Sequence, residues 1–462
     1  MIPPFEINPE IVRLARHLRR RGGRALLVGG VVRDLLRGHA SKDYDLEVYG
    51  LPLDRLEAAL SELGEVIAVG RAFGVLKVKG IDADFSIPRR DSKTGRGHRG
   101  FIVELDPELD FETAARRRDL TVNSIAYDPL TGEILDPYDG RRDLERGILR
   151  ATDSQTFSED SLRALRVAQF RARLEMEPDD ELVSLCASLD LSDLAGERVF
   201  EELRKLLLRA RRPSLGFEFL ENTGLLRFFP ELEAMVGVPQ DPEWHPEGTV
   251  WEHTLLVLDE AAALRQGDPE VDLPLMFGAL CHDIGKPATT AERGGHIVSP
   301  GHDEEGAEPT VRMLGRLRAA HRLTDQVVAL VRFHLAPGLL PRNGAKPKAY
   351  RRLTRKLAAA EIDYRLLYRL ARADHFGRTT PDALARHFPA GDEFLDQMEA
   401  VGQAETVAQD VVLGRHLLAR GFEPGPEIGR LLAACRDVQD ETGWSDPQRI
   451  LDQVLERRGE DS

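Results

Sequence analysis

The chain changes its hydrophobic periodicity once, near Asp153, and this change constrains the fold more than any other feature of the sequence. Before Asp153, short apolar or alternating runs predict β-strands, interspersed with helices over residues 6–21 and 53–63. After it, apolar residues recur at helical spacing as far as the C-terminus. The sequence therefore predicts a small α/β unit followed by helices. The expected strands cover residues 25–28, 44–49, 66–69, 75–78 and 83–87.

Length and composition are typical of a soluble globular protein. With 462 residues, of which 42% are hydrophobic and 31% charged, the chain is long enough for about three domains. No apolar run approaches the roughly 20 residues that cross a bilayer, and the N-terminus lacks the features of a signal peptide. The three cysteines, Cys186, Cys281 and Cys435, lie far apart without metal-ligand spacing. We therefore expect a cytoplasmic protein with reduced thiols and no membrane partner, and the sequence indicates nothing about its oligomeric state.

The charge of the chain is unevenly distributed. A net charge of −15 argues against indiscriminate binding of nucleic acids, because contacts to phosphate require clustered Lys and Arg. Two such clusters exist nonetheless, at residues 16–24 and 342–356. Each fits a solvated helix face, and the second, which contains no acidic residue, fits a contact with RNA equally well.

Two aspartates near the start of a predicted strand follow a glycine turn. Asp43 and Asp45 are one residue apart in sequence and so lie on the same face of an extended chain. Two carboxylates placed in this way suit Mg²⁺, which takes its remaining ligands from water and substrate phosphates. Gly29 and Gly30 allow backbone N–H groups to approach a triphosphate, so the pattern fits nucleotidyl transfer, although an ordinary loop and a solvated strand end also fit. Asp84 is either a third carboxylate of this site or a surface charge.

A further motif suits the sugar and phosphates of a nucleotide. Arg118, Asp119 and Asn123 combine a guanidinium, a carboxylate and an amide, which together can bind a triphosphate and ribose hydroxyls. A helix N-terminus with ion pairs would look the same. Residues 136–140 predict a turn, for which we favour the role of a structural connector.

Three charged residues at helical spacing could read a base. Asp160, Arg163 and Arg166 are three residues apart and lie on one side of a predicted helix. A carboxylate can accept from the exocyclic amine of cytosine or adenine, while a guanidinium donates to the neighbouring ring nitrogen or carbonyl. Such a pair would select C and A over U and G without a template. The alternative is an ion pair on the helix surface.

The order of these motifs closely resembles the bacterial (class II) tRNA nucleotidyltransferase and poly(A) polymerase family, over essentially the whole chain. The resemblance implies a polymerase-β-like α/β head followed by an all-α neck, body and tail. It also implies Mg²⁺ at catalytic Asp43 and Asp45, a triphosphate at the glycine turn and ribose near Asp119. The matching motifs are residues 29–34, 43–45, 117–123, 136–140, 159–163 and 197–202. The residues implied to bind nucleotide are Gly29, Gly30, Arg33, Arg118, Asp119, Asn123, Asp160, Arg163 and Arg166.

The subtype within this family is less constrained. Residues 70–75 look more like the CCA-adding branch than the poly(A) branch, which carries a more basic strand there. Members that add only CC, or only the terminal A, share the head motifs and differ in a loop near residues 90–110. Residues 90–100, rich in Gly and Arg, predict a mobile loop in this region. Full CCA, CC-only and A-only addition therefore stay open.

A second group of polar residues is spread over the helical part of the chain. It comprises His253, His282, Asp283, His302, His334 and Asp374. Imidazoles and carboxylates bind one or two borderline divalent ions, although each histidine by itself also fits a surface or packing role. The ordered set resembles the HD phosphohydrolase domain. The resemblance implies that all six are metal ligands, that His302 and His334 serve a second metal, and that Lys286 faces phosphate. Residues 244–248 precede the set, and their chemistry indicates no role.

These observations predict an enzyme with two activities. We expect a nucleotidyltransferase head over residues 1–150, a helical neck and body over 151–238, an HD domain over 239–385 and a helical tail over 386–462. The head would add CMP and AMP from CTP and ATP to tRNA 3′ ends without a template. The HD domain would hydrolyse phosphoesters, such as 2′,3′-cyclic or terminal phosphates, with a metal-activated water. The alternatives are a poly(A) polymerase acting on many RNA ends, and a phosphohydrolase whose head only binds nucleotide or RNA.

Overall fold

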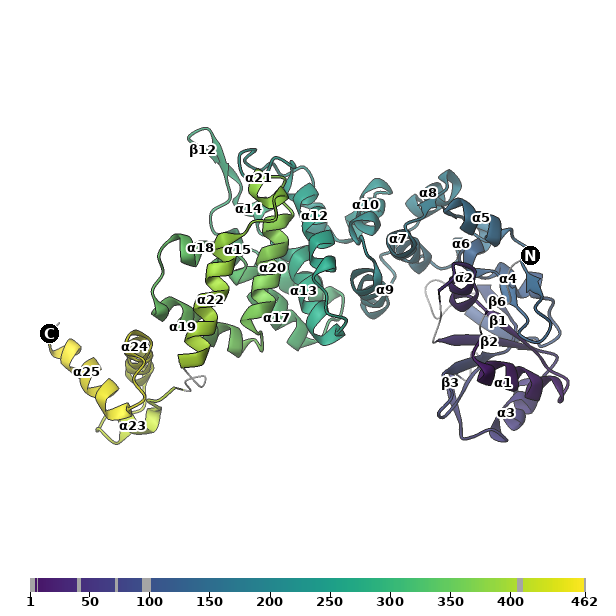
Figure 1. Ribbon diagram of the computed structural model, residues 1–462, viewed down its shortest axis with the longest axis horizontal. Helices are drawn as coiled ribbons and strands as arrows, with labels where there is room; N and C mark the ends of the chain where they lie inside the picture. Colours follow the sequence, from purple (N-terminus) through teal and green to yellow (C-terminus); the bar gives the residue numbers. More distant parts are fainter. Residues whose placement is uncertain are drawn as a thin grey trace. The chain divides into compact units, whose positions relative to one another are not determined.

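The chain forms two compact units, Met1–Phe228 and Phe229–Ser462 (Figure 1). The computed structural model describes residues 5, 7–39, 43–70, 74–93, 101–404 and 410–460. Among these residues, every helix is too short or too polar to cross a membrane. Cys186, Cys281 and Cys435 are all buried and free, which agrees with the expected reduced thiols.

A seven-stranded mixed sheet forms the centre of the first unit, with strand order β3–β4–β5–β2–β1–β8–β9. Strands β2 and β5 are parallel, and the other neighbours are antiparallel. The five predicted strands are all present, whereas β8 and β9, of two residues each, were too short to show a period. The strands are β1 (Arg24–Val28), β2 (Tyr44–Tyr49), β3 (Val66–Gly70), β4 (Val75–Val78), β5 (Ala83–Ser86), β8 (Ala126–Tyr127) and β9 (Ile134–Leu135).

Alternation along β1 gives the sheet two covered faces. Ala25 and Leu27 pack into a core with α1 (Pro9–Arg19), α2 (Gly30–Leu36) and α3 (Leu53–Ser61). Leu26 and Val28 face the other way, into a smaller core with α4 (Phe111–Arg116). On β2, the core residues Leu46 and Val48 face the α1 side, so Asp45 and Glu47 lie on the α4 side. The functional carboxylates of β2 are therefore on the face that α4 approaches.

The predicted mobile loop over residues 90–100 is wrong in its first part. Residues 90–93 belong to β6 (Arg89–Lys93), which pairs with β7 (Phe101–Leu105) in an antiparallel hairpin. The polar sequence of β6 has no strand period of its own, and its conformation is set by backbone hydrogen bonds to the apolar β7. Residues 94–100, and residues 71–73 of the segment that favours the CCA-adding branch, lie outside the described part of the chain.

The rest of the first unit is mainly helical and begins at the predicted change of periodicity. The Asp153 carboxylate accepts a hydrogen bond from Thr156 N at 2.9 Å and so caps α6. Helix α7 then packs against α9 and α10 through buried side chains such as Leu165 and Leu206. A short parallel pair of β10 (Ile148–Leu149) and β11 (Glu177–Pro178) lies among these helices. The helices are α5 (Gly140–Arg146), α6 (Ser154–Phe157), α7 (Leu162–Leu174), α8 (Asp180–Ala187), α9 (Gly196–Arg209) and α10 (Ser214–Asn222).

The second unit is built around four packed helices. Helices α12 and α17 flank α13, and α20 packs against α12 and α13 (Figure 1). One β-hairpin, β12 (Ala291–Arg293) with β13 (His296–Val298), interrupts the helical sequence. The principal helices of this part are α12 (Val250–Ala263), α13 (Pro269–Cys281), α14 (Lys286–Thr289), α15 (His302–Glu305), α16 (Ala307–Arg316), α17 (His321–Phe333), α18 (Ala336–Arg342), α20 (Tyr364–Phe376), α21 (Pro381–Leu384) and α22 (Pro389–Ala404).

The basic stretch at residues 342–356 packs largely against the C-terminal helices. It lies mainly on α19 (Pro347–Ala359), and α23 (Gly414–Leu418), α24 (Pro426–Thr442) and α25 (Pro447–Glu460) follow. Lys348 Nζ lies 2.7 Å from a carboxylate oxygen of Glu441 on α24. Arg352 Nη2 lies 2.9 Å from Asp437 on the same helix, and Arg355 pairs with the buried Asp440. Much of the predicted RNA-binding charge is thus neutralised by α24, because acidic residues distant in sequence face it.

Candidate functional sites

Asp45, one of the two predicted catalytic carboxylates, lies on the strand next to that of Asp84, the possible third carboxylate. Asp45 on β2 is in register with Asp84 on the parallel β5, so both side chains are on one face of the sheet. Burial raises the pKa of Asp45, and the charges of Asp84 and Asp43 raise it further against the opposing effect of Arg118. Such crowded carboxylates favour a cation, so the residues fit Mg²⁺. Lys77 Nζ lies 2.8 Å from Asp84 Oδ1 and occupies that carboxylate.

The glycine turn lies beside these carboxylates. Gly29 has φ = 75°, a left-handed conformation that favours glycine, and α2 begins at the next residue. A Cβ atom on Gly29 would lie 3.2 Å from Arg118 Nη1 and 3.9 Å from Asp45 Oδ2. A side chain here would crowd both groups, so glycine keeps the space beside them open.

One pocket of about 310 Å³ joins the turn, the carboxylates and several arginines. Two of its arginines, Arg173 on α7 and Arg209 on α9, were missed by the sequence analysis. Burial and the charges of Arg33 and Arg209 lower the pKa of Arg173 to about 10. Arg173 could have been found from the sequence, because it lies about two helical turns after Arg166 and so on the same face of the helix. The predicted residues that line the pocket are Gly29, Gly30, Arg33, Asp43, Asp45, Arg118, Asn123 and Arg166.

Asp119 is buried in a hydrogen-bonded chain next to this pocket. Its Oδ2 lies 2.7 Å from Arg166 Nη2, and its Oδ1 accepts a hydrogen bond from Asn123 Nδ2 at 3.0 Å. Asn123 Oδ1 in turn accepts from Arg33 Nη1 at 2.6 Å. Burial alone would raise the pKa of Asp119, but Arg166 and Asn123 lower it to about 2. These hydrogen bonds and the ion pair therefore keep Asp119 ionised. They also fix the orientation of the predicted nucleotide-binding side chains of Arg33, Asn123 and Arg166.

The predicted base-reading residues are not paired with each other in the structure. Asp160 Oδ2 lies 2.9 Å from Arg198 Nη2 of α9. Arg163 donates to two backbone carbonyl oxygens, those of Thr156 and Arg117. These contacts do not include the alternative expected from the sequence, an ion pair between Asp160 and Arg163 on the helix surface. The reading of a base by these residues stays a prediction. At residues 136–140, Asp136 accepts hydrogen bonds from the N–H groups of α5's first turn, as expected for a connector.

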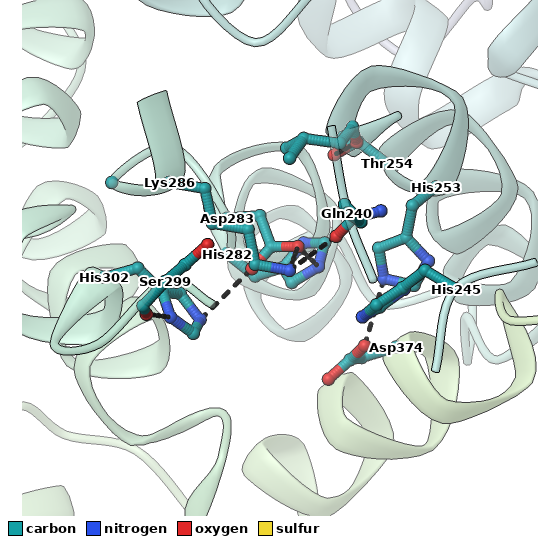
Figure 2. Close-up of polar contacts among 12 residues, drawn as sticks. Gln240, His245, His253, Thr254, His282, Asp283, Lys286, Ser299, His302 and Asp374 are labelled. Carbon is teal, nitrogen blue, oxygen red and sulfur yellow. Dashed lines mark hydrogen bonds and ion pairs between the residues drawn. The ribbon is translucent and has the colours of Figure 1, made fainter. Parts of the chain in front are cut away.

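The six predicted metal ligands of the second unit gather into two clusters that meet at the adjacent residues His282 and Asp283. Figure 2 labels five of them, all except His334. The first combines His253 of α12, His282 directly after α13, and Asp374 of α20, and the second combines Asp283, His302 and His334. In each cluster one ligand atom per residue lies within 4.8 Å of the others. Helices far apart in sequence thus bring together the residues that sequence analysis grouped.

The orientation of the histidines fits metal binding. His282, His302 and His334 each place Nδ1 within 2.6–2.9 Å of a backbone carbonyl oxygen, so Nδ1 carries the proton. Their Nε2 atoms therefore carry lone pairs, and these face the Asp283 carboxylate at 3.2, 3.3 and 3.9 Å. Two acceptors face one another stably only with a cation or a proton between them. The donor set is therefore the one that a divalent ion requires.

The protonation of Asp283 and His334 agrees with this arrangement. Burial would lower the pKa of His282 and His302, but Asp283 raises both, which favours a proton on each ring where no cation is bound. Burial and the charges of His282 and His302 lower the pKa of His334 to about 4, which keeps this imidazole neutral. Burial would raise the pKa of Asp283, but His282 and Lys286 hold it well below its usual range. Asp283 therefore stays an anion and His334 a neutral imidazole, the forms in which these side chains bind a metal.

Gly285 and Lys286 follow the His–Asp pair and hold the second cluster together. A Cβ atom on Gly285 would lie 2.1 Å from the carbonyl oxygen of His302, so only glycine lets α15 bring His302 close to Asp283. Lys286 is buried, and its Nζ lies 2.7 Å both from Asp283 Oδ2 and from Gln240 Oε1 (Figure 2). Its predicted role toward phosphate remains a prediction, since in the structure it stabilises a ligand.

Glu247, to which sequence analysis gave no role, orients the first cluster. Its Oε1 lies 2.8 Å from Nδ1 of His253 and 2.8 Å from Nδ1 of His245. Its Oε2 accepts a hydrogen bond from Thr379 N at 3.0 Å. A carboxylate on Nδ1 turns Nε2 of His253 toward Asp374, 3.1 Å away. The sequence offered one indication of this role, because the acidic Glu247 lies just before the helix that carries the predicted ligand His253.

Beside the second cluster lies another pocket of about 310 Å³. It is lined by His302 and Lys286 of the metal centre, by the cations Arg342 and Arg378, and by Trp244. A pocket of this size with convergent charge next to a metal centre can hold a small anionic substrate.

Three segments of the chain match known protein families. Residues 25–150 match the poly A polymerase head domain, and residues 250–376 match the HD domain. Between them, residues 183–236 match a probable RNA and SrmB-binding site of polymerase A. These matches follow the predicted order of a head, an RNA-binding body and an HD domain.

Whole proteins with the same organisation are also similar to this chain. The multifunctional CCA protein of Xanthomonas campestris pv. campestris (strain B100) is 35% identical over 424 residues, which cover 89% of this chain and 96% of that protein. The multifunctional CCA protein of Stenotrophomonas maltophilia (strain K279a) is 39% identical over 318 residues, covering 67% and 75%. The solved structure of the Bacillus stearothermophilus CCA-adding enzyme in complex with CTP has a TM-score of 0.66 at 21% identity, covering 100% of this chain and 99% of that one. The predicted fold class is confirmed, and the chain belongs to the multifunctional CCA protein family.

Proposed function

We propose that the head adds CMP and AMP, from CTP and ATP, to the 3′ end of tRNA without a template. The observation that carries this proposal is the pocket that joins Asp43 and Asp45 to the glycine turn and to several arginines. Mg²⁺ held by the two aspartates would activate the 3′ hydroxyl and neutralise the leaving pyrophosphate. Relatives named multifunctional CCA protein support the addition of CCA, and we propose tRNA as the acceptor and the cytoplasm as the place of action.

The protein's own residues divide the remaining work in this pocket. Arg118 and Arg209 contribute fixed positive charge where a triphosphate would lie. Arg173 adds to it, and its pKa of about 10 leaves it protonated at neutral pH. Asp160 and Arg163 would read the base after exchanging their present protein partners for its Watson–Crick edge. These exchanges are part of the proposal.

We further propose that the HD domain hydrolyses phosphoesters, such as a 2′,3′-cyclic or terminal phosphate that blocks a tRNA end. His253, His282 and Asp374 would hold one divalent ion, and Asp283, His302 and His334 a second. A metal bound there would supply an activated water. Glu247 fixes the ring of His253, and the carbonyl contacts fix the other three rings, so the chain itself orients the ligands.

Incubation with labelled nucleotides tests the head and separates the alternatives. A tRNA transcript lacking its terminal CCA is supplied with each NTP in turn and with all four, and its 3′ end is sequenced. We expect incorporation from CTP and ATP that stops after CCA. A run of A on unrelated RNA would indicate a poly(A) polymerase, and no incorporation would leave a phosphohydrolase with a binding head.

A further inference from the structure

We infer that the pocket beside the HD metal clusters recognises a single nucleotide unit, with Trp244 stacking on its base and Arg342 and Arg378 binding its phosphate. This inference rests on the proposed phosphoester hydrolysis and adds to it the residues that would select the substrate.

The pocket is cationic next to the metal clusters. Its acidic residue Asp241 is occupied by His296 Nδ1 at 3.0 Å and by Ile297 N at 3.3 Å. Arg378 Nη2 lies 3.5 Å from Asp374 Oδ1, while its buried Nε has no hydrogen-bond partner within the described residues. Arg342 is exposed, and it forms no ion pair with any residue that the structure describes. The exposed Arg342 thus keeps its N–H donors for a phosphate, and the fork of parallel N–H groups of a guanidinium suits phosphate oxygens, while Arg378 adds positive charge beside it.

The pocket also carries an exposed aromatic ring. Trp244 is 54% exposed, whereas Trp251 on α12 is 2% exposed and packs in the core. The turn that presents Trp244 is fixed, since Trp244 N donates to Asp241 O at 3.1 Å. Because Asp241 also bonds the β12–β13 hairpin at Ile297, one residue holds two walls of the pocket. An exposed indole on a hydrogen-bonded turn, beside cationic side chains, can serve as a stacking platform for a base.

The size and arrangement of these groups favour one nucleotide. About 310 Å³ is at the lower end of the volumes of small-ligand pockets, which suits a single nucleotide unit rather than a longer segment. Lys286 and His302 lie at the metal clusters (Figure 2) and also line the pocket. The phosphate would therefore lie on their side and the base toward Trp244.

Two substrates that differ only in the base test the stacking. The full chain, loaded with a divalent metal, is given adenosine 2′,3′-cyclic phosphate or the base-free methyl ribofuranoside 2,3-cyclic phosphate. Trp244→Ala should raise KM about tenfold for the adenosine substrate, leave kcat within about threefold, and leave the base-free substrate unaffected, since a stacked base contributes about 1–3 kcal/mol. Trp244→Phe should restore most of the affinity. Leu384→Ala, which removes another exposed apolar side chain on α21, is the matched control and should change nothing.

A binding measurement gives a second readout that does not depend on turnover. Calorimetry with adenosine 2′-monophosphate on the full chain without metal, where no hydrolysis occurs, should show weaker binding to Trp244→Ala and to Arg342→Ala, and Arg342→Ala should weaken binding of the base-free phosphate as well. Arg430→Ala, on α24, is the control for loss of an exposed arginine.

The possible failures are distinguishable. If wild-type protein hydrolyses both substrates and Trp244→Ala changes neither KM nor binding, the inference is overturned while the phosphohydrolase proposal stands. If no phosphoester is hydrolysed with any divalent metal, the proposed activity fails, and calorimetry alone decides whether the pocket binds a nucleotide.

Discussion

The two candidate centres of this chain are held in place in different ways. In the HD centre, Nδ1 of each predicted histidine ligand already lies within 2.9 Å of a carbonyl or carboxylate oxygen, and Nε2 faces inward. In the head, Asp160, Arg163 and Asp119 are each engaged by other parts of the protein. The comparison indicates that the HD donor atoms already have the placement that an ion would need, whereas the function that we propose for the head requires Asp160 and Arg163 to exchange protein contacts for contacts with a nucleotide. Substitution of the predicted metal ligands should therefore abolish the activity of the centre that they belong to. Substitutions at Asp160 should change the choice between nucleotides more than the rate of addition.

The largest effect should follow from removing the head carboxylates. Asp43→Ala with Asp45→Ala should lower nucleotide addition by at least about 10³-fold, since even one lost electrostatic stabiliser costs about 10²–10³-fold. Hydrolysis by the HD domain should be nearly unchanged. Both rates are measured on the same preparation, with Asp54→Ala, an exposed aspartate of α3, as the control. Addition at the wild-type rate would refute the assignment of the head.

The reverse experiment removes two ligands of the HD centre. His282→Ala with Asp283→Ala should lose metal-dependent hydrolysis and bound metal, because the change takes one ligand from each cluster. Extension of tRNA should persist. Elemental analysis and phosphodiesterase assays across several divalent ions follow both properties. Equal hydrolysis by variant and wild type would leave the HD domain as a structural or RNA-holding module.

An intermediate effect is expected at Glu247. Glu247→Ala removes the carboxylate on Nδ1 of His253 and should weaken metal binding about 10–100-fold, the usual effect of losing a residue that orients a ligand. Glu247→Gln, which can still accept a hydrogen bond, should lose less. Metal affinity is measured by competition with a chelator, and thermal unfolding of the metal-free proteins controls for stability. Unchanged affinity in Glu247→Ala would show that His253 is oriented without it.

The smallest effect should appear in nucleotide choice. Asp160→Ala should relax discrimination against UTP by about tenfold, toward the lower end of the roughly 1–3 kcal/mol for a specific base contact, because Arg163 remains. Arg198→Ala removes the present partner of Asp160 and should leave selection intact. The measured quantity is the ratio of kcat/KM for CTP and UTP on a tRNA lacking its terminal nucleotides. An unaltered ratio in Asp160→Ala would place base selection elsewhere.

The sequence predicted the elements with a clear period and the residues with unusual chemistry. Strands β2 and β4 were predicted with the bounds that the structure has. Apolar and polar residues alternate along most of β2, and β4 is mainly apolar. The hairpin of β6 was missed because its polar residues take their conformation from a partner strand. The contacts of Asp160 with Arg198, and of His253 with Glu247, depend on tertiary packing between distant segments. Sequence analysis could therefore propose members of a site but not the partners that position them.

One substrate tests directly whether the two centres act on the same RNA end. A tRNA that lacks CCA and ends in a 2′,3′-cyclic phosphate is incubated with CTP and ATP, and its 3′ end is sequenced. Wild-type protein should open the cyclic diester with one water, hydrolyse the resulting monoester with a second to release inorganic phosphate, and then add CCA, whereas His282→Ala with Asp283→Ala should extend only tRNA with a free 3′ hydroxyl. Extension of the blocked tRNA by this variant at the wild-type rate, or failure of the wild type to extend it, would contradict the account.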